Sequence, residues 1–259
     1  MRIRQSVCYP MIKPADMPLD DLCRQSKAIG YEAIEFWGRE ADYLDVIETA
    51  RRHDLIVASM CGHGSIGSGL NDATQHDRIE AELRESIDIA AKHDIPGVIC
   101  FGGNRIAGQS DDEAMIVCAR GLKRITPYAE QKGVNLNVEL LNSKVNHPGY
   151  LADRTDWGLA LCEMVGSDRA KLLYDIYHMQ IMEGDVIRTI RRAINRIGHF
   201  HTAGNPGRND FDDSQEMNYR GISRAIAATG YKLFVGHEFK PLGEAIEALA
   251  TAFAICDQG

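Results

Sequence analysis

The feature that most constrains this chain is a regular alternation between short apolar runs and longer amphipathic stretches. The short runs are rich in β-branched and other apolar residues, which is typical of buried strands. They predict strands at residues 2–9, 31–37, 55–61, 97–101, 134–141, 171–176, 198–202 and 231–238. Between them, as at 74–93, apolar residues recur at spacings of three and four, which predicts helices that bury one face.

Local signals predict where several of these helices begin and end. Ser110 followed by Glu113 matches a capping box, so we expect a helix to start there and to end at Gly133. Gly30 and Gly230 precede predicted strands in the same way and are also expected to end helices.

This succession of strands and helices predicts the fold class. Parallel strands need crossover helices, and eight of them can close into a barrel. The chain has no linker rich in Pro, Gly or Ser, no low-complexity tract and no exact repeat that would mark a boundary. We therefore expect a single (β/α)8 barrel domain over residues 1–259, with a doubly wound open sheet as the alternative.

Composition excludes several classes of partner. The formal net charge of −8 disfavours a protein that holds nucleic acid through phosphate contacts. The apolar runs are far shorter than the roughly 20 residues needed to cross a bilayer, so we expect no membrane partner. The charged start does not match a secretory signal, which predicts a cytoplasmic protein.

The seven cysteines form no CxxC pair and are expected to be reduced, buried thiols.

The polar residues that carry chemistry lie at the predicted strand ends, where barrel enzymes place their active sites. The last four strands each end with a carboxylate or an imidazole among apolar residues: Glu139, Asp175, His201 and Glu238. Ionised carboxylates are costly to bury without a compensating cation, so this convergence predicts a divalent metal. The oxygen-rich set suits Mn²⁺ or Mg²⁺, while the imidazole also admits Co²⁺ and Zn²⁺.

Other candidates are weaker. Residues 62–67 match GxGxxG but do not open a helix, which favours a mobile loop over the barrel mouth rather than a nucleotide site. His63 is either a pocket residue or a hydrogen-bonded loop histidine. His76, His93 and His147 are expected at the surface.

Five segments carry a resemblance to a known family. They are VELLNS at 138–143, HPGY at 147–150, DIYHMQ at 175–180, PGR at 206–208 and HEFKP at 237–241. Together they resemble the hydroxypyruvate isomerase branch of the xylose-isomerase-like barrels, over nearly the whole chain. The resemblance implies an enzyme that isomerises a small 2-oxo acid in the aldose–ketose manner, such as hydroxypyruvate to tartronate semialdehyde.

The resemblance also implies a role for each site residue. It gives acid/base roles to Glu139 and Glu238, the remaining metal positions to Asp175 and His201, contact with substrate oxygens to His178, and contact with the far end of the substrate to Arg208. Chemically, a forked guanidinium suits a substrate carboxylate, and Lys240 is expected either to assist it or to pair with a neighbouring acid. The partner is thus a small hydroxy acid, oxo acid or ketose, and homo-oligomerisation is left open.

Two alternatives stay open. His201 is more similar to the ketose 3-epimerase branch, whereas the second glutamate typical of those epimerases is missing from residues 140–145. A non-catalytic sugar-binding or metal-binding barrel is the alternative from another functional class, because fold does not fix function. A related class that cleaves DNA with three zinc ions would need more ligands than Glu35, His63 and Cys100 provide.

Overall fold

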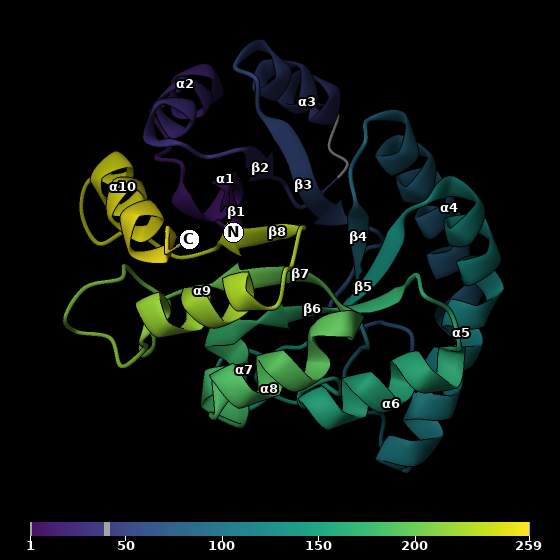
Figure 1. Cartoon of the computed structure of the whole chain (residues 1–259). Helices are drawn as coiled ribbons and strands as arrows, with labels where there is room; N and C mark the ends of the chain where they lie inside the picture. The colour runs from purple at the N-terminus through teal and green to yellow at the C-terminus, as the bar shows by residue number, and fades with distance from the viewer. Residues whose placement is uncertain (1, 39–41, 259) are drawn as a thin grey trace.

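The computed structural model describes residues 2–38 and 42–258, which form a closed barrel of eight parallel strands (Figure 1). The strands follow chain order around the barrel, and β1 pairs with β8 to close it. They are β1 (Arg4–Cys8), β2 (Ala33–Glu35), β3 (Ile56–Cys61), β4 (Gly97–Cys100), β5 (Asn135–Glu139), β6 (Ala170–Asp175), β7 (Ile197–Thr202) and β8 (Phe234–His237). All eight predicted strands and the (β/α)8 fold class are confirmed, and closure rules out the open sheet.

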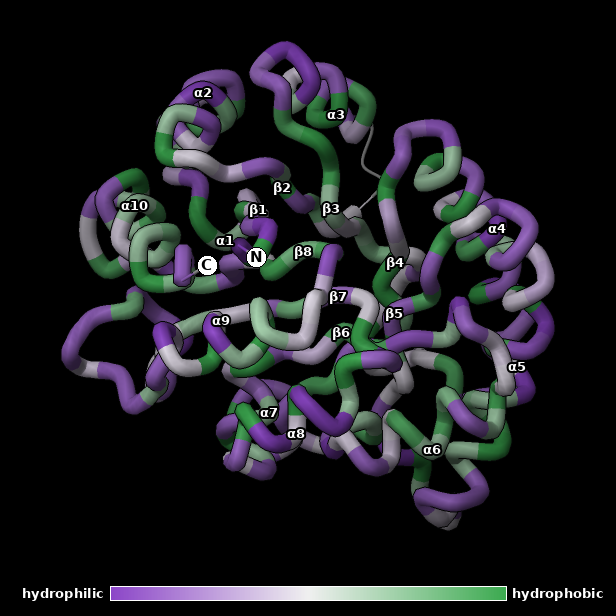
Figure 2. Tube along the Cα trace, viewed as in Figure 1, coloured by the Kyte–Doolittle hydropathy of each residue, from purple (hydrophilic) through white to green (hydrophobic). Residues whose placement is uncertain are grey.

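Helices connect the strands and surround the barrel (Figure 1). They are α1 (Tyr9–Ile12), α2 (Leu19–Ile29), α3 (Tyr43–Arg52), α4 (His76–Lys92), α5 (Asp111–Lys132), α6 (Thr155–Val165), α7 (Ile176–Met182), α8 (Val186–Ala193), α9 (Tyr219–Ala228) and α10 (Ala245–Cys256). Hydrophobic stretches run along barrel strands, whereas outer helix turns and loops are mostly hydrophilic (Figure 2). Within the described residues, no helix combines the length and apolarity needed to span a bilayer.

The predicted end signals of α5 are both present. The Ser110 hydroxyl accepts a hydrogen bond from the Glu113 amide at 3.2 Å, and the Glu113 carboxylate accepts one from the Ser110 amide at 2.9 Å. Gly133 ends the helix with a φ of 75°, a left-handed conformation that glycine adopts without a steric penalty. Local capping chemistry therefore sets the length of α5.

The main hydrophobic core lies between the barrel strands and the helices. Two small separate clusters also form: Ala33 with Ala58 and Phe234, and Ile99 with Phe101 and Leu173. Because strand side chains alternate between faces, every second residue points into the barrel. This alternation aims the polar residues at the strand ends toward one another.

One glycine on β8 leaves the space that a buried carboxylate occupies. A Cβ at Gly236 would overlap the carboxylate of Glu35 and approach the ring of His201. Gly198 on β7 leaves similar room for the side chain of Asn137. Both positions therefore require glycine, because a neighbouring polar side chain occupies the space that a Cβ would need.

The expectation that His76 is a surface residue is wrong. His76 is the first residue of α4 and is only 4% exposed. Its Nε2 lies 2.9 Å from the carbonyl oxygen of Leu70, and its ring packs against Gly121. This hydrogen bond satisfies the ring nitrogen, so His76 can be buried at a position where the sequence pattern alone indicated an exposed residue.

Candidate metal centre and active site

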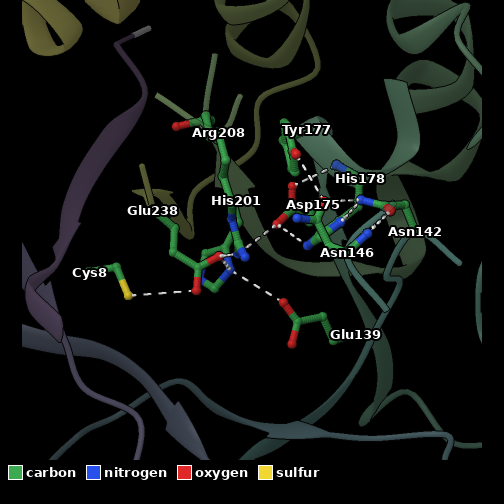
Figure 3. Close-up of polar contacts among 12 residues, drawn as sticks. Cys8, Glu139, Asn142, Asn146, Asp175, Tyr177, His178, His201, Arg208 and Glu238 are labelled. Carbon is green, nitrogen blue, oxygen red and sulfur yellow. Dashed lines mark hydrogen bonds and ion pairs between the residues drawn. The ribbon is translucent and has the colours of Figure 1, made fainter. Parts of the chain in front are cut away.

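The four predicted metal ligands meet at the carboxyl ends of β5 to β8 (Figure 3). Glu139 and Asp175 are the last residues of β5 and β6, His201 is next to last in β7, and Glu238 follows β8 directly. One potential ligand atom from each lies within 4.8 Å of the others, and all four residues are buried. The structure therefore brings together the set that the strand-end argument selected.

His201 lies at the centre of this set. Its Nδ1 is 3.5 Å from Glu139 Oε1 and 3.2 Å from Glu238 Oε2. Its Nε2 faces the other way and lies 3.0 Å from Oε2 of Glu35. The imidazole of His201 thus lies between the carboxylates of the proposed ligands and a further buried carboxylate, that of Glu35.

Glu35 is held in place by several hydrogen bonds. Its Oε2 also lies 2.9 Å from His199 Nε2, and its Oε1 accepts a hydrogen bond from the Ser6 hydroxyl. Burial alone would raise the pKa of Glu35, but His199 and His201 outweigh that effect and hold it well below the usual range. Glu35 is therefore an ionised acceptor, and Nε2 of His201 carries the hydrogen between them.

The donor set fits a divalent cation. With its Nε2 hydrogen given to Glu35, His201 directs Nδ1 toward Glu139 and Glu238, and in the described part of the chain this buried nitrogen makes no hydrogen bond of suitable geometry. Without a metal, a proton occupies this position, because Glu238 and Glu35 outweigh the effect of burial and raise the pKa of His201; a divalent cation would take the place of that proton. Three carboxylates and one imidazole are suitable ligands for Mn²⁺ and Mg²⁺.

The two glutamates have different proton affinities. Burial raises the pKa of Glu139, and it raises that of Asp175 in the same way. Burial also opposes ionisation of Glu238, but the charges of Arg208 and His201 outweigh it and hold the pKa of Glu238 well below its ordinary range. Carboxyl groups shifted in opposite directions are typical of acid/base pairs.

Arg208 reaches this site from the loop between β7 and α9. Its guanidinium donates a hydrogen bond to Glu238 and lies 3.8 Å from Asp175 Oδ2. Its backbone adopts a φ of 59°, and its carbonyl oxygen accepts a hydrogen bond from the Lys240 amide at 2.8 Å. The side chain of Lys240 is exposed and does not line the cavity. The structure thus places Arg208, but not the Lys240 ammonium, among the site residues.

His178 is fully buried at the start of α7. Its backbone amide donates to Asp175 Oδ1 at 3.0 Å, which caps the helix. Its ring Nδ1 lies 2.5 Å from Nδ2 of Asn142, and its Nε2 lies 3.5 Å from Asp175 Oδ2 (Figure 3). His178 therefore stands directly behind a proposed metal ligand.

A cavity of about 660 Å³ is lined by three of the four proposed ligands, Glu139, His201 and Glu238. Its polar wall contains Glu139, His147, His201, Arg208 and Glu238. Its other wall is mainly apolar and contains Trp37, Cys61, Ile66, Ile99, Phe101 and Leu141. The loop at 62–67 contributes to this lining, as a loop at the barrel mouth should. His147, expected at the surface, is half-buried and lines the cavity instead.

His63 is a hydrogen-bonded loop histidine at the cavity wall. Its Nε2 accepts a hydrogen bond from the Phe101 amide at 2.9 Å, and its Nδ1 lies 3.0 Å from the carbonyl oxygen of Gly64. Burial lowers the pKa of His63 to about 4. The ring is thus neutral and joins the loops that follow β3 and β4.

The cysteines near the cavity are thiols. Cys8 Sγ lies 3.9 Å from Glu238 Oε1, and burial raises the pKa of Cys8 and of Cys100. Burial raises the pKa of the partly exposed Cys61 as well. Since the thiolate is the reactive form, these residues are poor nucleophiles, as the expectation of buried thiols requires.

Two residues of the site were missed by sequence reasoning. Glu35 was considered only as a zinc ligand for a DNA-cleaving barrel, and Asn142 only as part of a motif. The signal for Glu35 was available, because it ends a short buried strand just as Glu139 does. For Asn142 no periodic signal exists, because it lies in the loop after β5.

Comparison with known proteins defines the family. A family described as "Xylose isomerase-like TIM barrel" matches residues 23–254, and the chain belongs to this family. The chain is 31% identical to hydroxypyruvate isomerase of Escherichia coli K12 over 169 residues, covering 62% of this chain and 64% of that one. It is 28% identical to 2-oxo-tetronate isomerase of Pectobacterium atrosepticum over 244 residues, covering 92% of each.

Among solved structures, a D-psicose 3-epimerase in the presence of D-fructose has the same fold. Its TM-score is 0.80 at 18% identity, covering 99% of this chain and 100% of that one. The predicted membership of the xylose-isomerase-like barrels is confirmed, and the relatives in the sequence comparison are isomerases by name.

Proposed function

We propose that the protein is an isomerase of a small 2-oxo acid, which moves hydrogen between adjacent carbons of an α-hydroxy carbonyl group. One observation carries this proposal: Glu139 and Glu238, at the ends of different strands, approach the same nitrogen of His201, and all three residues line the cavity. Two carboxyl groups so placed can act on neighbouring carbons of one bound molecule.

The proposed reaction needs three tasks from this chain. One of Glu139 and Glu238 removes the proton bound to carbon, and the other delivers a proton one carbon away. A divalent cation, held by these two residues with Asp175 and His201, would act as a Lewis acid toward the two oxygens of the α-hydroxy carbonyl. Arg208 orients the substrate carboxylate, and the apolar wall excludes water from the enediolate.

The named relatives support this substrate class. Hydroxypyruvate and 2-oxo-tetronate are both short oxo acids with a neighbouring hydroxyl group, and proteins named for their isomerisation match 62% and 92% of this chain. Among the described residues that line the cavity, Arg208 is the permanent cation, and it is the group that would bind their shared carboxylate.

A specific observation also favours a second candidate, a ketose 3-epimerase. The imidazole of His201 at the fourth ligand position is more similar to that branch, and the two glutamates could exchange a proton at a single carbon. The two candidates differ in substrate charge, since one takes an acid and the other a neutral sugar.

Proton exchange separates the candidates. The protein is incubated in heavy water with hydroxypyruvate, 2-oxo-tetronate and a panel of ketoses, and deuterium incorporation is followed by NMR. We expect exchange and isomerisation of an oxo acid, loss of both in chelator, and recovery with Mn²⁺. Exchange confined to C3 of a ketose would replace the proposal with epimerisation, and silence across the panel would favour a binding barrel.

Substitution of the glutamates tests the mechanism. Glu139→Gln and Glu238→Gln should each abolish turnover, because an amide cannot carry the proton. Glu183→Gln is the matched control, because Glu183 hydrogen-bonds only Thr155 among the residues described and lies outside the cavity lining. Near-native turnover of either glutamine variant would contradict the assignment.

A further inference from the structure

The side chain of Asn142 has only one orientation compatible with its neighbours. Its Oδ1 accepts hydrogen bonds from the backbone amides of Val145 at 3.0 Å and Asn146 at 2.8 Å. Backbone amides can only donate, so the amide oxygen must face them and Nδ2 must face the other way. Asn142 is fully buried, so no water competes for these positions.

This orientation fixes the tautomer of His178. Nδ2 of Asn142 lies 2.5 Å from His178 Nδ1 and 2.8 Å from Oδ1 of Asn146. Because Nδ2 can only donate, Nδ1 of His178 must be the acceptor and cannot carry a hydrogen. The single hydrogen of the neutral ring is therefore on Nε2.

Asn146 is held in turn by Tyr177. Because Nδ2 of Asn142 can only donate, Oδ1 of Asn146 must face it, and the Tyr177 hydroxyl, which can donate or accept, donates to the same oxygen at 2.9 Å. The hydrogen-bond directions thus agree along the whole chain from the loop after β5 to His178 (Figure 3).

The Nε2–H that results has no partner among the described residues. Nε2 of His178 is buried there without a hydrogen bond, and Asp175 Oδ2 lies 3.5 Å away, beyond ordinary hydrogen-bond length. Leaving a buried donor unsatisfied is costly, so such a group indicates a ligand that satisfies it. Arg208, which lines the cavity, lies 3.8 Å from the same oxygen of Asp175, so this oxygen is next to a cavity-lining group.

We propose that Asn142 is a positioning residue that holds His178 with its hydrogen on Nε2, so that the ring offers a hydrogen-bond donor, and no base, to a substrate oxygen beside Asp175. The substrate contact rests on the proposed isomerase function, whereas the tautomer does not. A neutral donor stabilises negative charge that develops on an enediolate oxygen without exchanging a proton itself. Proton transfer is then left to the two glutamates.

Nitrogen NMR tests the tautomer directly. The protein is labelled with ¹⁵N-histidine and studied with Mg²⁺, which is diamagnetic, and His178→Gln identifies the signals of His178. We expect a protonated, pyrrole-type Nε2 and an unprotonated, pyridine-type Nδ1. A protonated Nδ1 in the unmodified chain would overturn the proposal, whatever reaction the protein catalyses.

Asn142→Asp is the decisive variant. It keeps an oxygen for the two backbone amides but replaces the Nδ2 donor with an acceptor, so Nδ1 of His178 should become protonated. Asn146→Asp adds the same charge one hydrogen bond further away and keeps the acceptor for Asn142 and Tyr177. We expect the Nδ1 signal to move in Asn142→Asp only.

Activity gives the second readout. On the substrate found by proton exchange, kcat should fall about ten- to a hundredfold in Asn142→Asp with a smaller change in KM, and little in Asn146→Asp. If both variants lost kcat equally and the ¹⁵N signals of His178 did not change, Asn142 would have only a structural role. Failure of the isomerase proposal would instead appear as absent turnover in the unmodified protein with the tautomer signals intact.

Discussion

Oε2 of Glu35 lies 3.0 Å from Nε2 of His201, which joins the end of β2 to the proposed metal ligand on β7. Since an ionised acceptor on one side of an imidazole leaves the lone pair on the other side, this contact presents Nδ1 to a cation. Glu35→Gln should therefore weaken Mn²⁺ binding about ten- to a hundredfold, as loss of such partners does in other metal sites. Isothermal titration calorimetry measures the affinity without reference to turnover.

Glu183→Gln serves as the control for this measurement, and thermal unfolding shows whether each variant is folded. Unchanged Mn²⁺ affinity in a folded Glu35→Gln variant would show that His201 needs no help from Glu35.

Gly236→Ala should disturb the same contact from β8. A Cβ at this position overlaps the Glu35 carboxylate, so the substitution should lower both Mn²⁺ affinity and stability, the latter by about 1–3 kcal/mol. Gly198→Ala, which meets Asn137 instead, should lower stability by a similar amount and leave Mn²⁺ affinity unchanged. Denaturant unfolding and calorimetry on both variants decide this, and equal metal affinities would contradict the expectation.

Arg208 and Lys240 should differ in their effect on substrate binding. Arg208→Gln removes the cation of the cavity and should lower kcat/KM for an oxo acid about ten- to a hundredfold, and less for a neutral ketose. Lys240→Met should change kcat/KM little, because its side chain lies outside the cavity lining. Steady-state kinetics with both substrate types provide the test, and a severe defect in Lys240→Met would return Lys240 to the site.

His63 should make stability depend on pH. Its folded-state pKa of about 4 lies below the ordinary value of about 6.5, so the unfolded chain binds a proton first as the pH falls. The neutral ring contributes stability above about pH 6.5, and that contribution is lost progressively toward pH 4. Between pH 7 and pH 5 this group should cost about 2 kcal/mol.

His63→Gln removes the titration but keeps a donor and an acceptor. Urea unfolding at pH 7 and pH 5 should then show a smaller loss of stability in the variant than in the unmodified protein. A loss of the same size in both would assign the pH dependence to other groups.

The fold and the convergence of the four proposed ligands could be predicted from the sequence, because both depend on strand ends. Glu139, Asp175, His201 and Glu238 each follow a buried apolar run, and the closed parallel barrel brings those ends together. Even the length of α5 followed from Ser110 and Gly133.

What could not be predicted depends on contacts across the barrel. Nothing local to Glu35 indicates that it faces His201, because the register of β2 and β7 in the closed sheet decides that contact. The burial of His76 has a local cause instead, because its partner is the carbonyl oxygen of Leu70 in the loop that precedes α4. The exposed side chain of Lys240 could not be predicted either, since neighbouring residues of a motif can point in opposite directions.

The division of the cavity into a polar and an apolar wall has an evolutionary consequence. The polar wall comes mostly from β5 to β8 and their loops, whereas Trp37, Ile66 and Phe101 come from the segments after β2, β3 and β4. Changes in the second group can reshape the space for a substrate without moving the groups that transfer the proton. Substrate preference in such a barrel can therefore change by mutation after β2 to β4, while β5 to β8 keep the residues of the reaction.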